Sequence, residues 1–305
     1  MPDSFSNRTA LEAHQLAQFR ALLAAILPAN LFHARKFSGC GLEKAPETLG
    51  DFRARVPFTS KSEIATDQMA NPPFGSNLTF PVESYTRQHQ TSGTSGAPLR
   101  WLDTTASWTW MLDNWERVHR AGGVTKHDRI FFAFSFGPFL GFWTAFESAV
   151  RIGALVIPGG GMSSAARLRT ILETRATVVC CTPTYAIRLA EVAAEEKIDL
   201  RKSAVRLLSV AGEPGGSIPA VRARLQQLWP GVRVHDHHGM TETGPVSYED
   251  PARPCNLRVI ESAYLAEVIN STTLQPVVPG ETGELVLTTL GRTARRSFAT
   301  APAIW

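Results

Sequence analysis

Between Ser107 and Asp236 the sequence alternates segments of helical and of extended pattern. The helical segments carry apolar side chains at helical spacing, and the extended segments are short apolar runs. This rhythm favours a parallel sheet covered by helices on both faces. The expected helices span 107–120, 139–151, 164–174, 183–197 and 218–228, and the expected strands span 129–134, 154–157, 177–181, 205–211 and 232–236.

The segments on either side of this stretch follow other patterns. Residues 8–27 predict an amphipathic helix, and the pattern Ser60-x-x-Glu63 predicts a capping box that starts a short helix. From about residue 259 strands alone are expected, at 263–269 and 284–289, with a turn rich in Pro and Gly between them. We therefore predict an α/β protein of mostly parallel sheets flanked by helices, with a β-rich C-terminal portion.

Three portions of the chain are expected. Residues 1–90 would be helical or irregular and would lie against the main domain, residues 91–258 would form the α/β portion, and residues 259–305 would form the β-rich portion.

Composition narrows the class of protein. With 31 basic and 27 acidic residues among 305, the net charge of +4 is too small to favour a nucleic-acid partner. No apolar run approaches the length of a membrane span, so no membrane partner is expected. The cysteines form no Cys-x-x-Cys pair, which argues against a zinc knuckle or a redox motif. Cys180 and Cys181 lie in an apolar run and are expected in the core, and a reduced, cytoplasmic setting follows.

A loop rich in hydroxyl groups precedes the alternating stretch. It holds Thr91, Ser92, Gly93, Thr94, Ser95 and Gly96. Glycine lets successive backbone N–H groups turn toward one point, and such a concavity attracts anions. The loop suits a polyphosphate, although no Gly-Lys-Ser/Thr follows at the spacing of a Walker A loop. A flexible Ser/Gly turn remains the alternative.

Two further clusters follow predicted strands, where ligands of parallel sheets bind. The first is Ala211-Gly212-Glu213-Pro214, which places a carboxylate beside a glycine, and a plain strand-to-helix turn is its alternative. The second cluster, residues 237–244, follows the strand predicted at 232–236. In it, the hydroxyl of Thr241 suits a phosphate oxygen and the carboxylate of Glu242 suits Mg²⁺. The adjacent His237 and His238 would point to opposite faces of a strand, so we do not expect them to share a transition metal.

In this order, these segments resemble the adenylate-forming ligase superfamily, and in particular its phenylacetate-CoA ligase branch. The hydroxyl-rich loop matches that family's Ser-Ser-Gly-Thr-Thr-Gly-Lys-Pro loop, Gly212-Glu213-Pro214 its Gly-Ala-Glu-Pro turn, and residues 238–242 its Tyr-Gly-x-Ser/Thr-Glu motif. Residues 56–61 and 283–290 add support for the branch.

The resemblance implies the large N-terminal domain of an AMP-forming acid–CoA ligase, with ATP, Mg²⁺ and CoA as cofactors and a small carboxylic acid as substrate. Residues 91–96 would hold the ATP phosphates, Thr241 and Glu242 would be catalytic, and Glu242 would hold Mg²⁺. The adenine would lie against Gly212, Glu213, Pro214, His238 and Gly239. The acid pocket would be lined by Phe134, Phe136, Gly137 and Ala211, whose aromatic rings favour an aryl or other apolar acid. Relatives of this branch are often dimers, so a homodimer is an expectation.

The sequence also departs from the family's pattern. Ala97 stands where the loop usually has a lysine, and His238 stands where it usually has a tyrosine. Relatives continue into an Arg-Tyr-Arg-Thr-Gly-Asp motif and a small lid domain that carries a lysine, whereas this chain ends in a different tail from about residue 293. Permitted codons for that tail encode the missing motif in another reading frame, so our hypothesis is a frameshift near residues 293–296. On this hypothesis the lid domain is absent and the ligase activity is very low.

Other functions stay open at this point. One alternative is a non-catalytic remnant that binds a nucleotide or an acid, and another is an adenylating enzyme that loads a carrier protein. A nicotinamide dinucleotide fold is disfavoured, because no Gly-x-Gly-x-x-Gly opens a βαβ unit.

Overall fold

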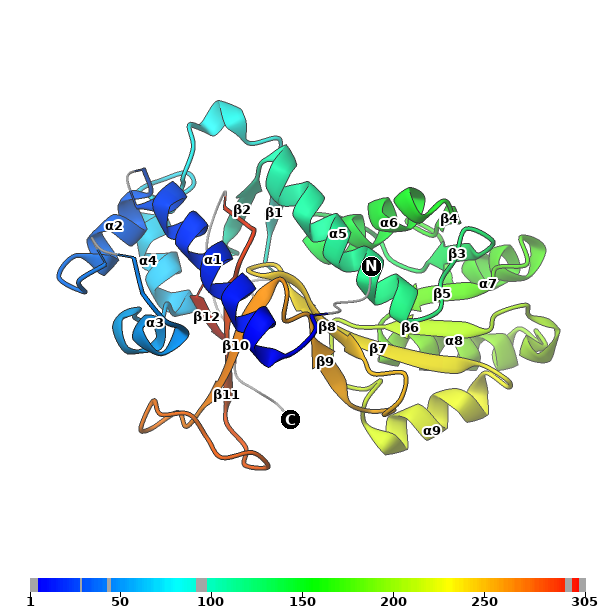
Figure 1. The fold of residues 1–305 in the computed structure, drawn as a ribbon. Helices are drawn as coiled ribbons and strands as arrows, with labels where there is room; N and C mark the ends of the chain where they lie inside the picture. Colours follow the sequence, from blue (N-terminus) through cyan, green and yellow to red (C-terminus); the bar gives the residue numbers. More distant parts are fainter. Residues whose placement is uncertain (1–4, 28, 43–44, 92–97, 294–297, 302–305) are drawn as a thin grey trace. The chain divides into compact units, whose positions relative to one another are not determined.

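The structure is a computed structural model that describes residues 5–27, 29–42, 45–91 and 98–293, and the backbone of 298–301 (Figure 1). The predicted phosphate-binding residues Ser92, Gly93, Thr94, Ser95 and Gly96 lie outside the described residues. The chain divides into two compact units. Unit 1 holds residues 1–111, 241–243 and 260–305, and unit 2 holds residues 112–240 and 244–259. The portion boundaries drawn from the sequence stay a prediction.

Unit 2, which the structure describes throughout, is built on a seven-stranded sheet with the order β4-β3-β5-β6-β7-β8-β9 (Figure 1). Its first five strands in that order are parallel, and β8 and β9 are antiparallel additions. The parallel strands are β3 (Arg129–Phe132), β4 (Leu155–Pro158), β5 (Val178–Cys181), β6 (Leu207–Val210) and β7 (Arg233–Met240). The antiparallel strands are β8 (Gly244–Glu249) and β9 (Leu257–Val259). The predicted α/β class with a mostly parallel sheet is confirmed.

Helices cover both faces of this sheet. They are α5 (Thr105–Ala121, of which residues 112–121 belong to unit 2), α6 (Leu140–Ile152), α7 (Ser164–Glu173), α8 (Pro183–Glu195) and α9 (Pro219–Leu228), with a short 3-10 turn η2 (Leu200–Lys202). Alternate residues of the strands, such as Phe131, Val179 and Leu208, form one buried cluster with α7, α8 and α9. On the opposite face Phe132 contacts Phe146 of α6, with ring centroids 5.2 Å apart.

Unit 1 combines helices with two small sheets. Its helices are α1 (Arg8–Ile26), α2 (Leu31–Phe37), α3 (Leu49–Arg55) and α4 (Lys61–Ala70), with a 3-10 turn η1 (Val82–Ser84). One sheet pairs β1 (Arg87–Gln90) with β2 (Arg100–Asp103), and the other has the antiparallel order β10 (Tyr264–Ile269), β11 (Glu284–Thr289), β12 (Phe298–Ala301). Phe19 and Ile26 of α1 are fully buried in a cluster that includes Leu265 and Leu290.

The predicted elements agree with these bounds to within a few residues. The capping box at Ser60 and Glu63 is confirmed at the start of α4, and Cys180 and Cys181 are buried as expected. The elements α2, α3, β1, β2, β8, β9 and β12 are not predicted from the sequence, because the two helices have fewer than two turns and these strands lack the continuous apolar run of β3 to β6. The predicted strand 232–236 runs on to Met240, because its second half pairs with β8.

Within the described residues no single helix is both long and apolar enough to cross a membrane. Taken together, α1 and α2 meet that length and composition, but they are bent by 112° relative to each other.

Candidate functional site

The turn after β6 lies at the carboxyl edge of the parallel sheet in unit 2. Gly212 has a φ of +90°, a backbone conformation that favours glycine. The carboxylate of Glu213 accepts a hydrogen bond from the backbone N–H of Thr184 at 2.7 Å, in the first turn of α8. A carboxylate at a helix N-terminus is favourable because unpaired N–H groups point toward it. Glu213 therefore joins the ends of two neighbouring strands, β5 and β6.

The next strand, β7, brings His238 and Gly239 to this edge. The register with β8 shifts between these two residues, which marks a bulge in the strand pair. A Cβ atom on Gly239 would lie 2.8 Å from the carbonyl oxygen of Gly244, so the close approach of the two backbones requires glycine here. Burial lowers the pKa of His238, which keeps its ring neutral at pH 7. A neutral, flat ring beside a glycine suits stacking against another ring.

Aromatic rings gather at the carboxyl end of β3. Phe134 stacks on Phe142 with centroids 4.2 Å apart, and Phe136 lies 5.0 Å from Trp143. Phe136 and Gly137 both have a positive φ, of 58° and 56°, and the indole N–H of Trp143 donates to the carbonyl of Gly137 at 2.8 Å. A left-handed phenylalanine is strained, and such strain gathers at functional sites.

Other predicted acid-pocket and nucleotide residues occupy the same edge. Ala211 follows β6, and its N–H donates to the carbonyl of Cys181 at the end of β5. Because the sheet order is β3-β5-β6-β7, the topology brings these residues of unit 2 to one edge: Phe134, Phe136, Gly137, Ala211, Gly212, Glu213, Pro214, His238 and Gly239. Their individual roles stay predictions.

In unit 1, Thr91 closes the base of the hydroxyl-rich loop. Its N–H donates to the carbonyl of Leu99, and the N–H of Leu99 donates to the Thr91 hydroxyl, each at 3.0 Å. Thr91 is buried. The backbone and the hydroxyl oxygen of Thr91 thus hold it beside Leu99.

The predicted catalytic residues Thr241 and Glu242 lie in a short loop of unit 1. Arg292 donates to the carbonyl of Thr241 at 2.7 Å, and the hydroxyl of Tyr264 donates to the carbonyl of Thr243 at 2.9 Å. The Glu242 carboxylate lies 4.0 Å from the Nζ atom of Lys61, the first residue of α4. The loop is therefore held by its backbone, while the Glu242 side chain faces a cation.

Two residues of this cluster were not predicted as site residues. Lys61 is the last residue of the motif at 56–61, and Arg292 closely follows the family-like segment 283–290, but neither motif assigns its residue to a site. Both meet the Thr241–Glu242 loop only through the fold, so a spacing argument cannot find them.

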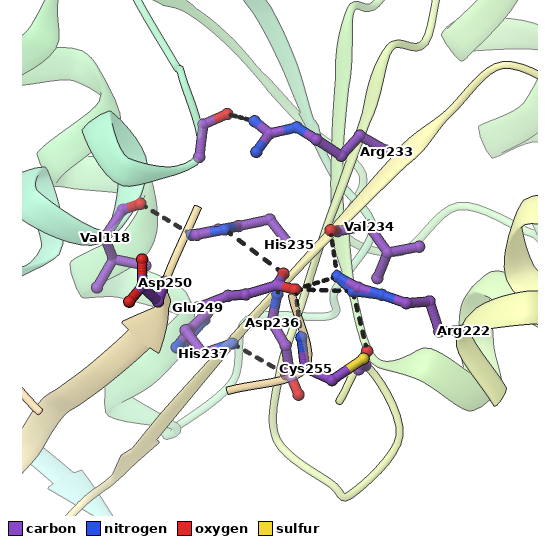
Figure 2. A network of polar contacts seen from close by, with 12 residues as sticks. Val118, Arg222, Arg233, Val234, His235, Asp236, His237, Glu249, Asp250 and Cys255 are labelled. Atoms are coloured by element: carbon purple, nitrogen blue, oxygen red, sulfur yellow. Dashed lines mark hydrogen bonds and ion pairs between the residues drawn. The ribbon is translucent and has the colours of Figure 1, made fainter. Parts of the chain in front are cut away.

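A buried polar network fixes β7 to β8 within unit 2 (Figure 2). Glu249 accepts hydrogen bonds from Arg222 at 2.9 Å and from the N–H of Asp236 at 3.2 Å. His235 donates through Nε2 to the carbonyl of Val118 at 3.1 Å, and burial lowers its pKa to about 4. Burial also raises the pKa of Asp236. The network ties down the strand whose far end carries His238.

Residues 90–293 match the AMP-binding enzyme family, and the chain belongs to this family. It is 28% identical to a phenylacetate-coenzyme A ligase of Pseudomonas putida over 93% of its length, and 28% identical to one of Escherichia coli K12 over 93%. The chain spans 64% and 66% of the length of these two curated relatives. Crystal structures of a 2-hydroxyisobutyryl-CoA ligase with 2-HIB-AMP and CoA match 95% and 96% of this chain, with TM-scores of 0.89 and 0.90 and identities of 27% and 28%. The predicted likeness to the phenylacetate-CoA ligase branch is confirmed.

Proposed function

We propose that this chain carries the adenylation site of an AMP-forming carboxylic acid–CoA ligase. In the first step the acid carboxylate attacks the α-phosphorus of ATP and pyrophosphate leaves. In the second step the CoA thiol attacks the acyl carbonyl and AMP leaves, which forms a thioester. One observation carries the proposal. The Gly212-Glu213 turn, which follows β6, and His238-Gly239 of the neighbouring strand β7 lie at the carboxyl edge of the sheet, in a chain of the AMP-binding family.

The hydroxyl of Thr241 and the ammonium group of Lys61 suit the negative charge of a nucleotide phosphate. Transfer at phosphorus depends mainly on positioning and on charge neutralisation. In the proposal the hydroxyl of Thr241 donates to an α-phosphate oxygen, and Lys61 places a positive charge beside Glu242. The hydroxyl-rich residues 91–96 would bind the other phosphates.

The same loop fits the Mg²⁺ that the family implies. Mg²⁺ in nucleotide sites takes one or two carboxylates together with phosphate oxygens and water. The Glu242 carboxylate, with 15% of its side chain exposed, is a donor of this kind. When bound, Mg²⁺ would supply charge neutralisation, and Glu242 would be the residue that holds it.

The aromatic group at the end of β3 supports an aryl or other apolar acid as substrate. Phe134 and Phe136 offer flat apolar faces that pack well against a ring or a branched chain, and they have little to offer a second charge. We extend the proposal to a homodimer in the cytoplasm on the likeness to the branch alone.

Exchange of labelled pyrophosphate into ATP tests the proposal. The purified chain is incubated with MgATP and, in turn, phenylacetate, benzoate, 2-hydroxyisobutyrate and acetate. Slow exchange that depends on an aryl acid is the expected result. Binding of a nonhydrolysable ATP analogue without exchange for any acid would favour the non-catalytic remnant instead. Where exchange occurs, transfer to CoA is compared with transfer to a phosphopantetheine carrier protein, and CoA is the expected acceptor.

A further inference from the structure

Arg292 is the largest charged side chain that is fully buried among the described residues, with 0% exposure. Its Nε and Nη2 atoms donate to the two carboxylate oxygens of Asp103 at 2.8 and 2.6 Å, and Asp103 is equally buried. Its Nη1 atom donates to the carbonyl of Thr241 at 2.7 Å. One planar guanidinium thus binds two segments that are distant in the sequence.

Both segments adjoin parts of the candidate site in unit 1. Asp103 is the last residue of β2, and the hydroxyl-rich loop connects β1 to β2. Thr241 opens the loop that carries Glu242. The β1–β2 pair and the Thr241–Glu242 loop therefore meet at Arg292, which sets the distance between their backbones.

The surroundings leave the guanidinium little freedom. It lies over the ring of Trp101, 5.5 Å from the centroid, and the preceding residue, Gly291, passes so close to Trp110 that a Cβ atom there would lie 2.2 Å from the indole Nε1. Tyr264 holds the other end of the loop through the carbonyl of Thr243. A lysine could not reproduce these contacts, because it lacks the fork that binds a carboxylate with two parallel hydrogen bonds.

Stability alone does not account for such a pair. Removing two charges from water is unfavourable, and apolar residues of similar volume often serve the fold as well or better. What the ion pair provides and an apolar pair cannot is direction, because the third donor of the guanidinium is aimed at one carbonyl.

We propose that Arg292 is a positioning residue for the candidate nucleotide-binding loop Thr241–Glu242, whose backbone it sets against the β1–β2 pair. This inference rests on the proposed function. It predicts that the backbone of the Thr241–Glu242 loop is no longer held in one conformation when Arg292 is replaced, even in variants that fold.

Two variants test this role. Asp103→Leu/Arg292→Met replaces the ion pair by apolar side chains, and Arg292→Lys keeps a buried cation but loses the fork. Arg206→Met is a control, because Arg206, with 44% of its side chain exposed, also binds a buried carboxylate, that of Asp128, at the amino end of the sheet in unit 2. Melting temperatures identify the variants that fold, and Arg292→Lys serves where the double variant does not.

The first readout needs no nucleotide. Hydrogen exchange of a peptide covering 238–244 is expected to quicken in the folded Arg292 variants and to stay unchanged in Arg206→Met. The second readout is the exchange assay, in which the KM for ATP is expected to rise about tenfold or more while the KM for the acid stays within about twofold.

The outcomes separate the two proposals. Unchanged hydrogen exchange at 238–244 in a folded variant would overturn the positioning role, and so would an unchanged KM for ATP. A wild-type chain that neither binds nor turns over a nucleotide would contradict the proposed function, while the hydrogen-exchange result would still decide whether Arg292 anchors the loop.

Discussion

The ammonium group of Lys61 lies 4.0 Å from the carboxylate of Glu242. About half of the lysine side chain is exposed, at 46%, whereas the glutamate is mostly covered. An ion pair of this exposure contributes little to stability. In the proposed function, the role of Lys61 is to place a positive charge beside the candidate nucleotide site.

Lys61→Met is expected to leave the melting temperature nearly unchanged and to raise the KM for MgATP about fivefold, which corresponds to about 1 kcal/mol. Lys202→Met, on the 3-10 turn η2 of unit 2, is the control and should change neither quantity. Pyrophosphate exchange measured at several ATP concentrations checks this. An equal effect of both lysines would show that only the net charge matters.

The backbone contact at Gly239 predicts a local loss of stability. In Gly239→Ala the new Cβ atom would press against the carbonyl oxygen of Gly244, and the expected destabilisation is about 1–3 kcal/mol. Gly141→Ala provides a matched control, because a Cβ atom on Gly141 in α6 would meet nothing within 4 Å. There alanine is expected to stabilise the helix by about 0.5–1 kcal/mol. Urea unfolding of the two variants should move in opposite directions.

The left-handed backbone of Phe136 predicts a difference between two replacements of the same side chain. Phe136→Ala and Phe136→Gly both remove the ring that contacts Trp143 and Phe146, and both should reduce the preference for aryl acids over acetate in the exchange assay. Phe136→Gly should nevertheless be more stable than Phe136→Ala by about 1 kcal/mol, because glycine adopts a φ of +58° without strain. Equal stability of the two variants would contradict the strained conformation.

Buried histidines predict that stability falls in mild acid. Burial lowers the pKa of His119 and of His235 from 6.5 to about 4 in the folded state. Because the unfolded chain binds a proton below pH 6.5 and the folded chain does not, the stability is complete above pH 6.5 and is lost as the pH falls toward 4. Each histidine should account for a loss of about 2 kcal/mol between pH 7.5 and pH 5.

His119→Gln isolates one share of that loss, since the glutamine amide can still donate to the carbonyl of Ala145, which His119 contacts at 3.1 Å. The free energy of unfolding in urea, measured at pH 7.5 and pH 5, should fall less in this variant than in the wild type. A pH dependence identical to that of the wild type would mean that His119 has the same pKa in the folded protein as in the unfolded chain.

The sequence predicted the parts of the fold that repeat a pattern. The alternation from α5 to β7 carries its own period, and the capping box at Ser60 is a local motif. The seven α-helices and strands that the sequence does not predict contain neither two full helical turns nor a continuous apolar run. Candidate site residues could be proposed only where they lie in local motifs, such as 211–214 and 238–242, and their roles stay predictions. The contacts of Lys61 with Glu242 and of Arg292 with Asp103 could not be predicted from the sequence, because only folding brings the members of each pair together. Arg292 and Asp103 are separated by 189 positions.

The tight passage of Gly291 against Trp110 limits how this chain can be redesigned. A side chain at position 291 requires the indole of Trp110 to move or to be replaced by a smaller residue, so the two positions are coupled. A mutagenesis library that varies the two positions jointly is therefore expected to hold more folded members with a side chain at position 291 than one that varies position 291 alone.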